Sequence, residues 1–185
     1  SEVCGRPARI ARTGYTGEDG FEVYSAPQDA EALWAALLEA GREFGVKPCG
    51  LGARNTLRLE AAMPLYGHEI DQSITPLEAG LEWTVKLDKG DFLGRAVLLR
   101  QREEGVRRRL AGFEMLGRGI ARDGYEVRAG GHAEGWVTSG APSPTLGRNI
   151  GLCYLPPEFA VAGTGIEVVV RGQAAEAVTV ATPFY

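Results

Sequence analysis

Acidic and phenolic side chains surround a glycine-rich turn near the start of the chain, at residues 14–20 (GYTGEDG). A carboxylate flanked by aromatic rings can hold a flat heterocycle, because it accepts two hydrogen bonds from a ring N–H and an exocyclic amine. The acids would repel a phosphate, and the glycine spacing matches neither nucleotide-binding fingerprint. The sequence therefore predicts either a heterocycle-binding hairpin or an ordinary solvated turn. The side chains concerned are Tyr15, Glu18, Asp19, Glu22 and Tyr24.

A second candidate is the stretch GLGAR at residues 50–54, where a helix is expected to begin. Backbone N–H groups at the start of a helix favour negative charge, and the guanidinium of Arg54 adds a planar fork of donors. A carboxylate, from a ligand or from another residue, is the natural partner of Arg54. An ordinary charged helix face, on which Arg58 pairs with Glu60 or with solvent, explains the same residues equally well.

Residues 137–147 (VTSGAPSPTLG) contain hydroxyl groups but no complete nucleophilic site. A serine nucleophile needs a neighbouring base; the nearest histidine, His132, has no acid in sequence to orient it, and no GxSxG elbow is present. The two prolines favour a rigid loop that presents hydroxyls to a neighbouring surface.

Two histidines and three scattered cysteines give no metal-ligand spacing, so no metal site is predicted.

The composition excludes several classes of partner. Twenty Lys and Arg against 24 Asp and Glu give a net charge of −4, so neither nucleic acid nor an anionic membrane is an expected partner. No apolar run approaches the ~20 residues of a membrane span, and no signal pattern is seen, which predicts a cytoplasmic protein.

The 26 glycines are about twice the usual share of roughly 7%, which predicts many turns or close backbone approaches.

The elements that must position these residues alternate between strands and helices up to about residue 100. Strand alternation on both sides of the glycine-rich turn predicts a hairpin, and apolar residues at helical spacing after Pro27 predict a helix. A long polar connection over residues 64–80 is unusual in a compact domain and suggests a functional loop. The tryptophans and cysteines are expected in the core. The expected elements are strands over 9–13 and 21–24, helices from Pro27 to Gly41 or Gly45 and from Gly50 to Pro64, a strand over 81–87 and a helix over 92–102.

After residue 110 the pattern changes to short strands separated by glycine turns. Pairs such as Gly130-Gly131 supply the positive φ of tight hairpins, and this spacing is typical of a small antiparallel β-barrel or sandwich. The charged run 101–109 is the candidate linker, so we expect an α+β segment over residues 1–104 and an all-β domain over 105–185. The strands are expected over 108–115, 124–128, 133–138, 150–155, 165–171 and 174–181.

Five stretches, in order along the chain, resemble the T-protein (aminomethyltransferase) family of the glycine cleavage system. The closing residues TPFY also resemble that family's C-terminal strand. The resemblance implies an α+β fold, in which a folate-binding α/β segment of the T-protein fold precedes a small antiparallel β-barrel domain. The five stretches are ARTGYTGEDGFE from Ala11, GLGARNTLRLEAAMPLYGHEI from Gly50, TPLEAGLEWTVKLDK from Thr75, DFLGRAVL from Asp91 and VTSGAPSPTLGRNIGL from Val137.

The resemblance also implies an activity. Family members pass the one-carbon unit of the aminomethyl group on the reduced lipoyl arm of H-protein to tetrahydrofolate, and release ammonia. It implies tetrahydrofolate as co-substrate, lipoylated H-protein as partner, no metal, and a cytoplasmic location (mitochondrial in a eukaryote). By the same resemblance Tyr15 lies in the folate pocket, Glu22 binds the pterin ring and Arg54 is a further ligand-site residue.

The resemblance covers only the C-terminal half of the family. The aspartate held to be central to the reaction lies in the N-terminal half, so we expect no catalytic residue here, no activity of the chain alone, and the missing half as a partner. The C-terminal part of a sarcosine or dimethylglycine dehydrogenase and a non-catalytic folate-binding module are alternatives. The related iron–sulfur assembly factor carries a KGCYxGQE-like motif, and residues 89–95 (KGDFLGR) contain no cysteine, which argues against it.

Overall fold

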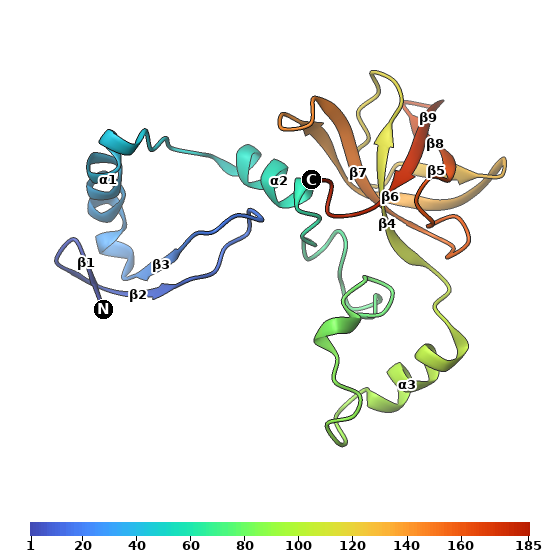
Figure 1. The fold of residues 1–185 in the computed structure, drawn as a ribbon, viewed down its shortest axis with the longest axis horizontal. Helices are drawn as coiled ribbons and strands as arrows, with labels where there is room; N and C mark the ends of the chain where they lie inside the picture. The colour runs from blue at the N-terminus through green and yellow to red at the C-terminus, as the bar shows by residue number, and fades with distance from the viewer. The chain divides into compact units, whose positions relative to one another are not determined.

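A computed structural model of the protein describes all 185 residues, and Figure 1 shows their fold. The chain forms two compact units, Ser1–Arg58 and Leu59–Tyr185. The predicted fold class is confirmed, since strands and helices are mixed up to residue 104 and a β-barrel follows. None of the helices is long and apolar enough to cross a membrane.

The first unit is built on a three-stranded antiparallel sheet in the order β1-β2-β3. The strands β2 and β3 form the predicted hairpin, in which Ala11 pairs with Glu22 and Ala8 with Ser25. Helices follow the sheet as predicted, although a short 3-10 turn that begins at Pro27 precedes α1. The elements are β1 (Glu2–Val3), β2 (Arg6–Ala11), β3 (Glu22–Ser25), η1 (Pro27–Asp29), α1 (Ala30–Ala40), η2 (Arg42–Phe44) and α2 (Leu51–Glu60), whose last two residues belong to the second unit.

The second unit contains a closed antiparallel barrel in the order β4-β7-β6-β5-β8-β9. The strand β4 closes it, because β4 pairs with β7 along one edge and with β9 along the other. A closed barrel leaves no unpaired strand edge. The elements are η3 (Glu82–Thr84), α3 (Arg95–Glu104), β4 (Arg109–Met115), β5 (Glu126–Ala129), β6 (His132–Ser143), β7 (Arg148–Leu155), β8 (Gly165–Val170) and β9 (Gln173–Val180).

The barrel holds most of the buried apolar residues. Its interior cluster includes Phe113, Val127, Val137 and Val168, all of them fully buried. A smaller cluster of Leu59, Ala141, Ile150 and Leu152 joins the end of α2 to strands β6 and β7. The apolar positions that alternate along the barrel strands therefore face inward, as the period of two requires.

Two sequence-based predictions of local structure are wrong. The segment 81–87 alternates like a strand, but its only regular element is the 3-10 turn η3, and the closed barrel of the same unit offers it no free strand edge. Residues 137–143 do not form a loop, because they continue β6 and pair with β7, with a register shift between Val137 and Ser139. Only residues 144–147 remain as the turn between these two strands.

The expectation that the tryptophans and cysteines lie in the core is also largely wrong. Trp34 is 55% exposed and Trp83 is 71% exposed, while Cys4 and Cys49 are exposed and only Cys153 is buried. Apolar spacing identifies one face of an element, but it does not say whether another element covers that face.

One glycine of the barrel is required by a close backbone approach. A Cβ atom added at Gly135, in β6, would lie 1.8 Å from the backbone oxygen of Tyr154. We expect Gly135→Ala to lower the free energy of unfolding by about 3 kcal/mol or more, because the backbone of β7 would have to move. Chemical denaturation followed by tryptophan fluorescence measures this loss.

The control for this experiment is Gly165→Ala in β8. A Cβ at Gly165 would meet nothing within 4 Å, so we expect a change within about 0.5 kcal/mol. Equal losses for the two variants would contradict the assignment of Gly135 to a close approach.

Candidate functional site

The β2–β3 hairpin carries the glycine-rich loop at its tip. Gly17 in this loop has a φ of +78°, a left-handed conformation that favours glycine. The hydroxyl oxygen of Thr16 accepts a hydrogen bond from the backbone N–H of Glu18 at 3.3 Å. The loop is thus held by its own polar groups, as expected for a glycine-rich turn between paired strands.

An ion pair closes the base of the loop. Arg12 donates from Nε to Oδ1 of Asp19 at 3.0 Å and from Nη2 to Oδ2 at 2.7 Å. These two bonds, with a weaker one from the backbone of Gly20, hold the pKa of Asp19 below its ordinary value. Asp19 is therefore ionised and already paired, so it is less suited to bind a ligand than the other carboxylates of the hairpin.

Glu22 begins strand β3 and is held by the opposite side of the loop. The hydroxyl of Thr13 donates a hydrogen bond to Oε2 of Glu22. A carboxylate has about four lone-pair sites, so this bond orients Glu22 and leaves it capacity to accept further hydrogen bonds. Glu22 is solvent-exposed, as a ligand-binding acid has to be.

Arg54 lies in the first turn of α2 and contacts Tyr15 of the loop. The guanidinium carbon of Arg54 is 4.5 Å from the centre of the Tyr15 ring, within the range of a cation–π interaction. The guanidinium stacks through its face, while its N–H donors lie in its plane. The structure therefore brings together Tyr15 and Arg54, which are far apart in sequence, and leaves Arg54 able to bind an acidic group.

Arg58 follows Arg54 by one helical turn but takes a different partner. Its Nε and Nη2 donate to Oδ1 of Asn55 at 3.0 and 2.7 Å. Of the two partners left open for Arg58, Glu60 or solvent, solvent is excluded because Arg58 is 1% exposed. The Glu60 carboxylate accepts hydrogen bonds from the hydroxyls of Ser143 and Thr145.

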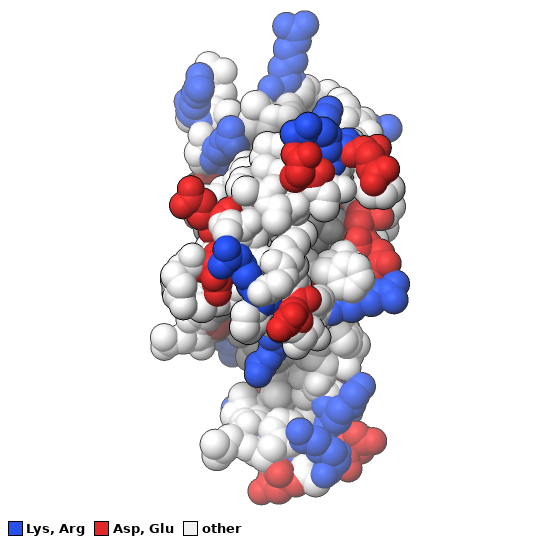
Figure 2. All heavy atoms as spheres, turned by 90° about the vertical axis from the view of Figure 1, so that its left-hand side faces the viewer, with Lys and Arg blue, Asp and Glu red and all other residues white.

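Charge is evenly distributed over the face shown in Figure 2. Lys and Arg side chains lie among Asp and Glu side chains and large uncharged areas, with no continuous area of one sign. This distribution agrees with the small net charge of −4.

Comparison with known proteins identifies the family. The family model described as "GCVT N-terminal domain" matches residues 1–89. The model described as "Glycine cleavage T-protein C-terminal barrel domain" matches residues 108–185. The chain belongs to the glycine cleavage T-protein family. Residues 90–107, between the two matches, include most of the predicted linker, while the predicted boundary between residues 104 and 105 stays a prediction.

Individual relatives of the T-protein family cover the whole chain. A protein named aminomethyltransferase from Geobacillus sp. (strain WCH70) is 55% identical over 184 residues, which are 99% of this chain and 50% of that protein. One from Symbiobacterium thermophilum is 56% identical over 185 residues, 99% of this chain and 49% of that protein. The crystal structure of glycine cleavage system aminomethyltransferase T from Bartonella henselae has a TM-score of 0.88 at 34% identity and covers 95% of this chain and 49% of that one. The chain thus spans about half the length of these relatives.

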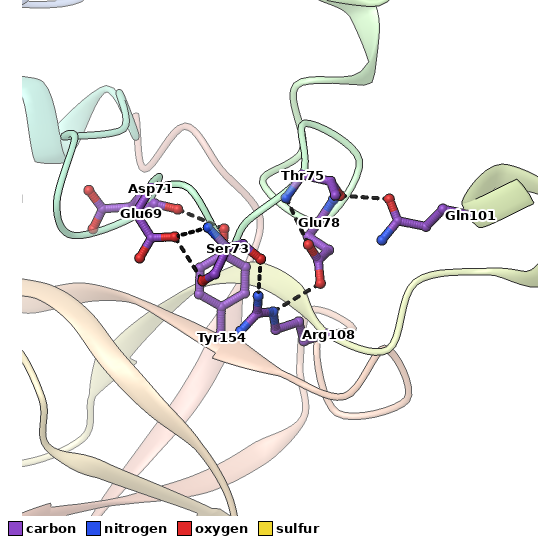
Figure 3. A network of polar contacts seen from close by, with 8 residues as sticks. All are labelled: Glu69, Asp71, Ser73, Thr75, Glu78, Gln101, Arg108 and Tyr154. Carbon is purple, nitrogen blue, oxygen red and sulfur yellow. Dashed lines mark hydrogen bonds and ion pairs between the residues drawn. The ribbon is translucent and has the colours of Figure 1, made fainter. Parts of the chain in front are cut away.

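Within the segment between α2 and the T-protein barrel, a polar network that the sequence analysis missed attaches the long connection to the barrel (Figure 3). Arg108 donates from Nε to Oε1 of Glu78 at 2.9 Å and from Nη2 to the backbone oxygen of Ser73 at 2.7 Å. Its guanidinium also lies 5.4 Å from the ring centre of Trp136 and 5.5 Å from that of Tyr154. The connection over residues 64–80 is therefore bound to the barrel at several points.

Thr75 and Glu78 form a reciprocal pair at the centre of this network. Oε2 of Glu78 accepts the backbone N–H of Thr75 at 2.8 Å, and the hydroxyl of Thr75 accepts the backbone N–H of Glu78 at 3.3 Å. The spacing T-x-x-E (TPLE, residues 75–78) is that of a capping box, and this sequence signal could have predicted the pair. Tyr154 adds a hydrogen bond from its hydroxyl to the backbone oxygen of Glu69 at 2.8 Å. The pKa of that hydroxyl is raised, mainly by burial and to a smaller extent by the negative charge of Glu78.

Loss of the Glu78 charge should loosen this connection. We expect Glu78→Gln to lower the free energy of unfolding by about 1–3 kcal/mol, because Arg108 loses its charged partner and the capping pair is weakened. Thermal denaturation of the variant measures the loss. The matched control is Glu82→Gln, a glutamate of the 3-10 turn η3 that is exposed, for which a comparable loss would contradict the role of Glu78.

Proposed function

We propose that this chain is part of the aminomethyltransferase of the glycine cleavage system. The proposed reaction transfers the one-carbon unit of the aminomethyl group on the dihydrolipoyl arm of H-protein to tetrahydrofolate, with release of ammonia. The observation that carries the proposal is the match of both T-protein family models, which together extend over most of the chain. The relatives described above carry the name aminomethyltransferase, which favours this reading over a sarcosine or dimethylglycine dehydrogenase.

In this proposal the hairpin loop and the start of α2 bind tetrahydrofolate. Glu22, oriented by Thr13, accepts hydrogen bonds from the N–H edge of the pterin. Tyr15 forms an aromatic wall, and Arg54, stacked on it at 4.5 Å, binds an acidic group of the folate. The chemistry of the three side chains, acid, phenol and guanidinium, complements a ligand that has an amine-rich ring at one end and carboxylates at the other.

The protein's task in such a transfer is to orient two substrates and to manage protons. The N5 and N10 atoms of tetrahydrofolate form bonds to the methylene carbon, and the bonds of that carbon to the amine nitrogen and to the lipoyl sulfur break. The protons lost from N5 and N10 leave with ammonia and the dihydrolipoyl thiol, so proximity and acid–base assistance are the main sources of rate. The residues of this chain would contribute orientation. The acid–base group is assigned to the part of the longer enzyme that this chain does not contain.

We also propose that this remaining part covers the apolar surface of the first unit. Leu33 is the one large apolar side chain buried in residues 1–58, whereas Tyr24, Trp34 and Phe44 are exposed. An open hollow of about 990 Å³ lies on the β2–β3 sheet, with Ile10 and Tyr24 in its lining. So few buried apolar groups give a small unit little stability of its own, and the relatives are about twice as long as this chain.

The activity is tested with the full-length enzyme and the 185-residue chain side by side. We expect the full-length enzyme to form 5,10-methylenetetrahydrofolate and ammonia from aminomethylated H-protein and tetrahydrofolate. We expect no turnover by the chain alone. An inactive full-length enzyme would refute the proposed reaction, and turnover by the chain alone would refute the assignment of the acid–base group to the other part.

The folate-binding role of Glu22 is tested by comparing two glutamates of the same hairpin. In the full-length enzyme we expect Glu22→Gln to weaken tetrahydrofolate binding about tenfold or more, because a charged acceptor for the pterin is lost. Glu18→Gln, the matched control in the loop, should change the affinity less than about twofold, within the usual effect of an exposed substitution. Calorimetric titration gives both dissociation constants, and equal effects would mean that the wrong acid has been assigned.

A further inference from the structure

The sheet of the first unit consists mainly of one hairpin. The strand β1 has two residues and pairs with β2 only at Arg6 and Pro7, so the rest of β2 has β3 as its only neighbouring strand. A two-stranded hairpin is only marginally stable in water, and a sheet needs at least three strands with an apolar face to be stable by itself. The first unit therefore lacks a strand neighbour on at least one side of the hairpin.

The two long edges of the hairpin differ. On the β2 edge, Pro7 has no N–H to donate, and the backbone N–H of Ala8 already donates to the carbonyl oxygen of Ser1 at 2.9 Å. The strand β3 has the sequence EVYS, without proline or lysine, and it pairs with β2 without a register shift. Lysine, proline and bulges are the usual means by which an edge strand avoids further pairing, so the edge of β3 is the open one.

The side chains of β3 also suit a strand inside a sheet. Val23 pairs with Ile10 and Tyr24 pairs with Arg9 across the hairpin. Successive side chains alternate between the two faces of a strand, so Val23 and Tyr24 lie on opposite faces, and both are exposed. β-Branched and aromatic side chains stabilise a sheet by packing against neighbouring strands, and β3 has such a neighbour on one side only.

The second unit has no strand to offer to this edge. All of its strands, β4 to β9, belong to the closed barrel, in which no edge is left unpaired. The relatives named above are about twice as long as this chain. The part of a longer enzyme outside this chain is thus long enough to supply a strand.

We propose that this remaining part adds a β-strand to the free edge of β3. Main-chain hydrogen bonds give the contact its affinity, and Val23 and Tyr24 provide the side-chain pairing. Because Glu22 begins β3, the added strand runs beside the residue assigned to the pterin. The inference rests on the proposed function in one respect, that the chain is part of a longer enzyme, and it does not depend on which ligand Glu22 binds.

The first test is hydrogen exchange of the full-length enzyme, read by mass spectrometry over the peptide that contains β3. Consecutive N–H groups of an antiparallel strand point alternately to its two sides, so β2 protects about two of the four amides of β3. An added strand protects the others, and we expect all four to exchange slowly. Fast exchange of alternate amides of β3 in the folded enzyme would overturn the inference.

Proline substitutions in the full-length enzyme are the second test. A strand tolerates proline only where the replaced N–H has no partner. The N–H groups of Val23 and Tyr24 point to opposite sides, so an edge strand tolerates proline at one of the two positions and an interior strand at neither. We expect Val23→Pro and Tyr24→Pro each to melt about 5 °C or more below the matched controls Val23→Ala and Tyr24→Ala.

A proline variant as stable as its alanine control would contradict the added strand. If neither proline variant folds, hydrogen exchange of the unsubstituted enzyme still decides between an edge strand and an interior one.

Hydrogen exchange of the 185-residue chain alone shows where the added strand comes from. We expect at least about two amides of β3 to exchange fast there, and slow exchange of all of them would overturn the inference, because a second copy of the chain would then supply the strand. A full-length enzyme that protects β3 but forms no 5,10-methylenetetrahydrofolate refutes the proposed reaction and leaves the added strand in place. An active enzyme with fast alternate amides in β3 refutes the added strand alone.

Discussion

A carboxylate taken out of water has to be supplied with hydrogen-bond donors, and this requirement organises the second unit. Glu60 takes its donors from Ser143 at the end of β6 and from Thr145 in the β6–β7 turn, and Glu78 takes its donors from Thr75 and Arg108. Both acids lie outside the barrel strands. Each accepts at least one hydrogen bond from a residue that lies on a barrel strand or next to one. The long connection after α2 has little regular secondary structure, and Glu78 binds it to Arg108 next to the barrel.

The two units differ in how their strands are completed. In the barrel every strand has a partner on both sides, because β4 pairs with both β7 and β9, and the apolar side chains meet inside. The sheet of the first unit is open, with β3 at one edge and aromatic side chains exposed on its strand and helix. The barrel is thus closed on itself, whereas the first unit carries the candidate ligand site on an open sheet.

The candidate site is partly pre-organised within the first unit. Thr13 orients Glu22 and the ring of Tyr15 supports Arg54, so the acid and the guanidinium are held by neighbours that do not neutralise them. Asp19, by contrast, is neutralised by Arg12. Two carboxylates of one hairpin thereby acquire different roles, one structural and one suited to a ligand, because their immediate partners differ.

The sequence alone determined the family, the succession of an α+β segment and a barrel, and the side-chain chemistry of the candidate site. Periodicity, glycine turns and ordered motifs are local signals, and they predicted α1, α2 and the approximate positions of the barrel strands, although β6 is longer than predicted. Only the tertiary structure decided that Tyr15 contacts Arg54, that Glu60 binds the β6–β7 turn, and that residues 81–87 are not a strand. It also decided that Trp83 is exposed. These outcomes depend on which segments distant in sequence meet in space, and a local pattern of residue types does not contain that information.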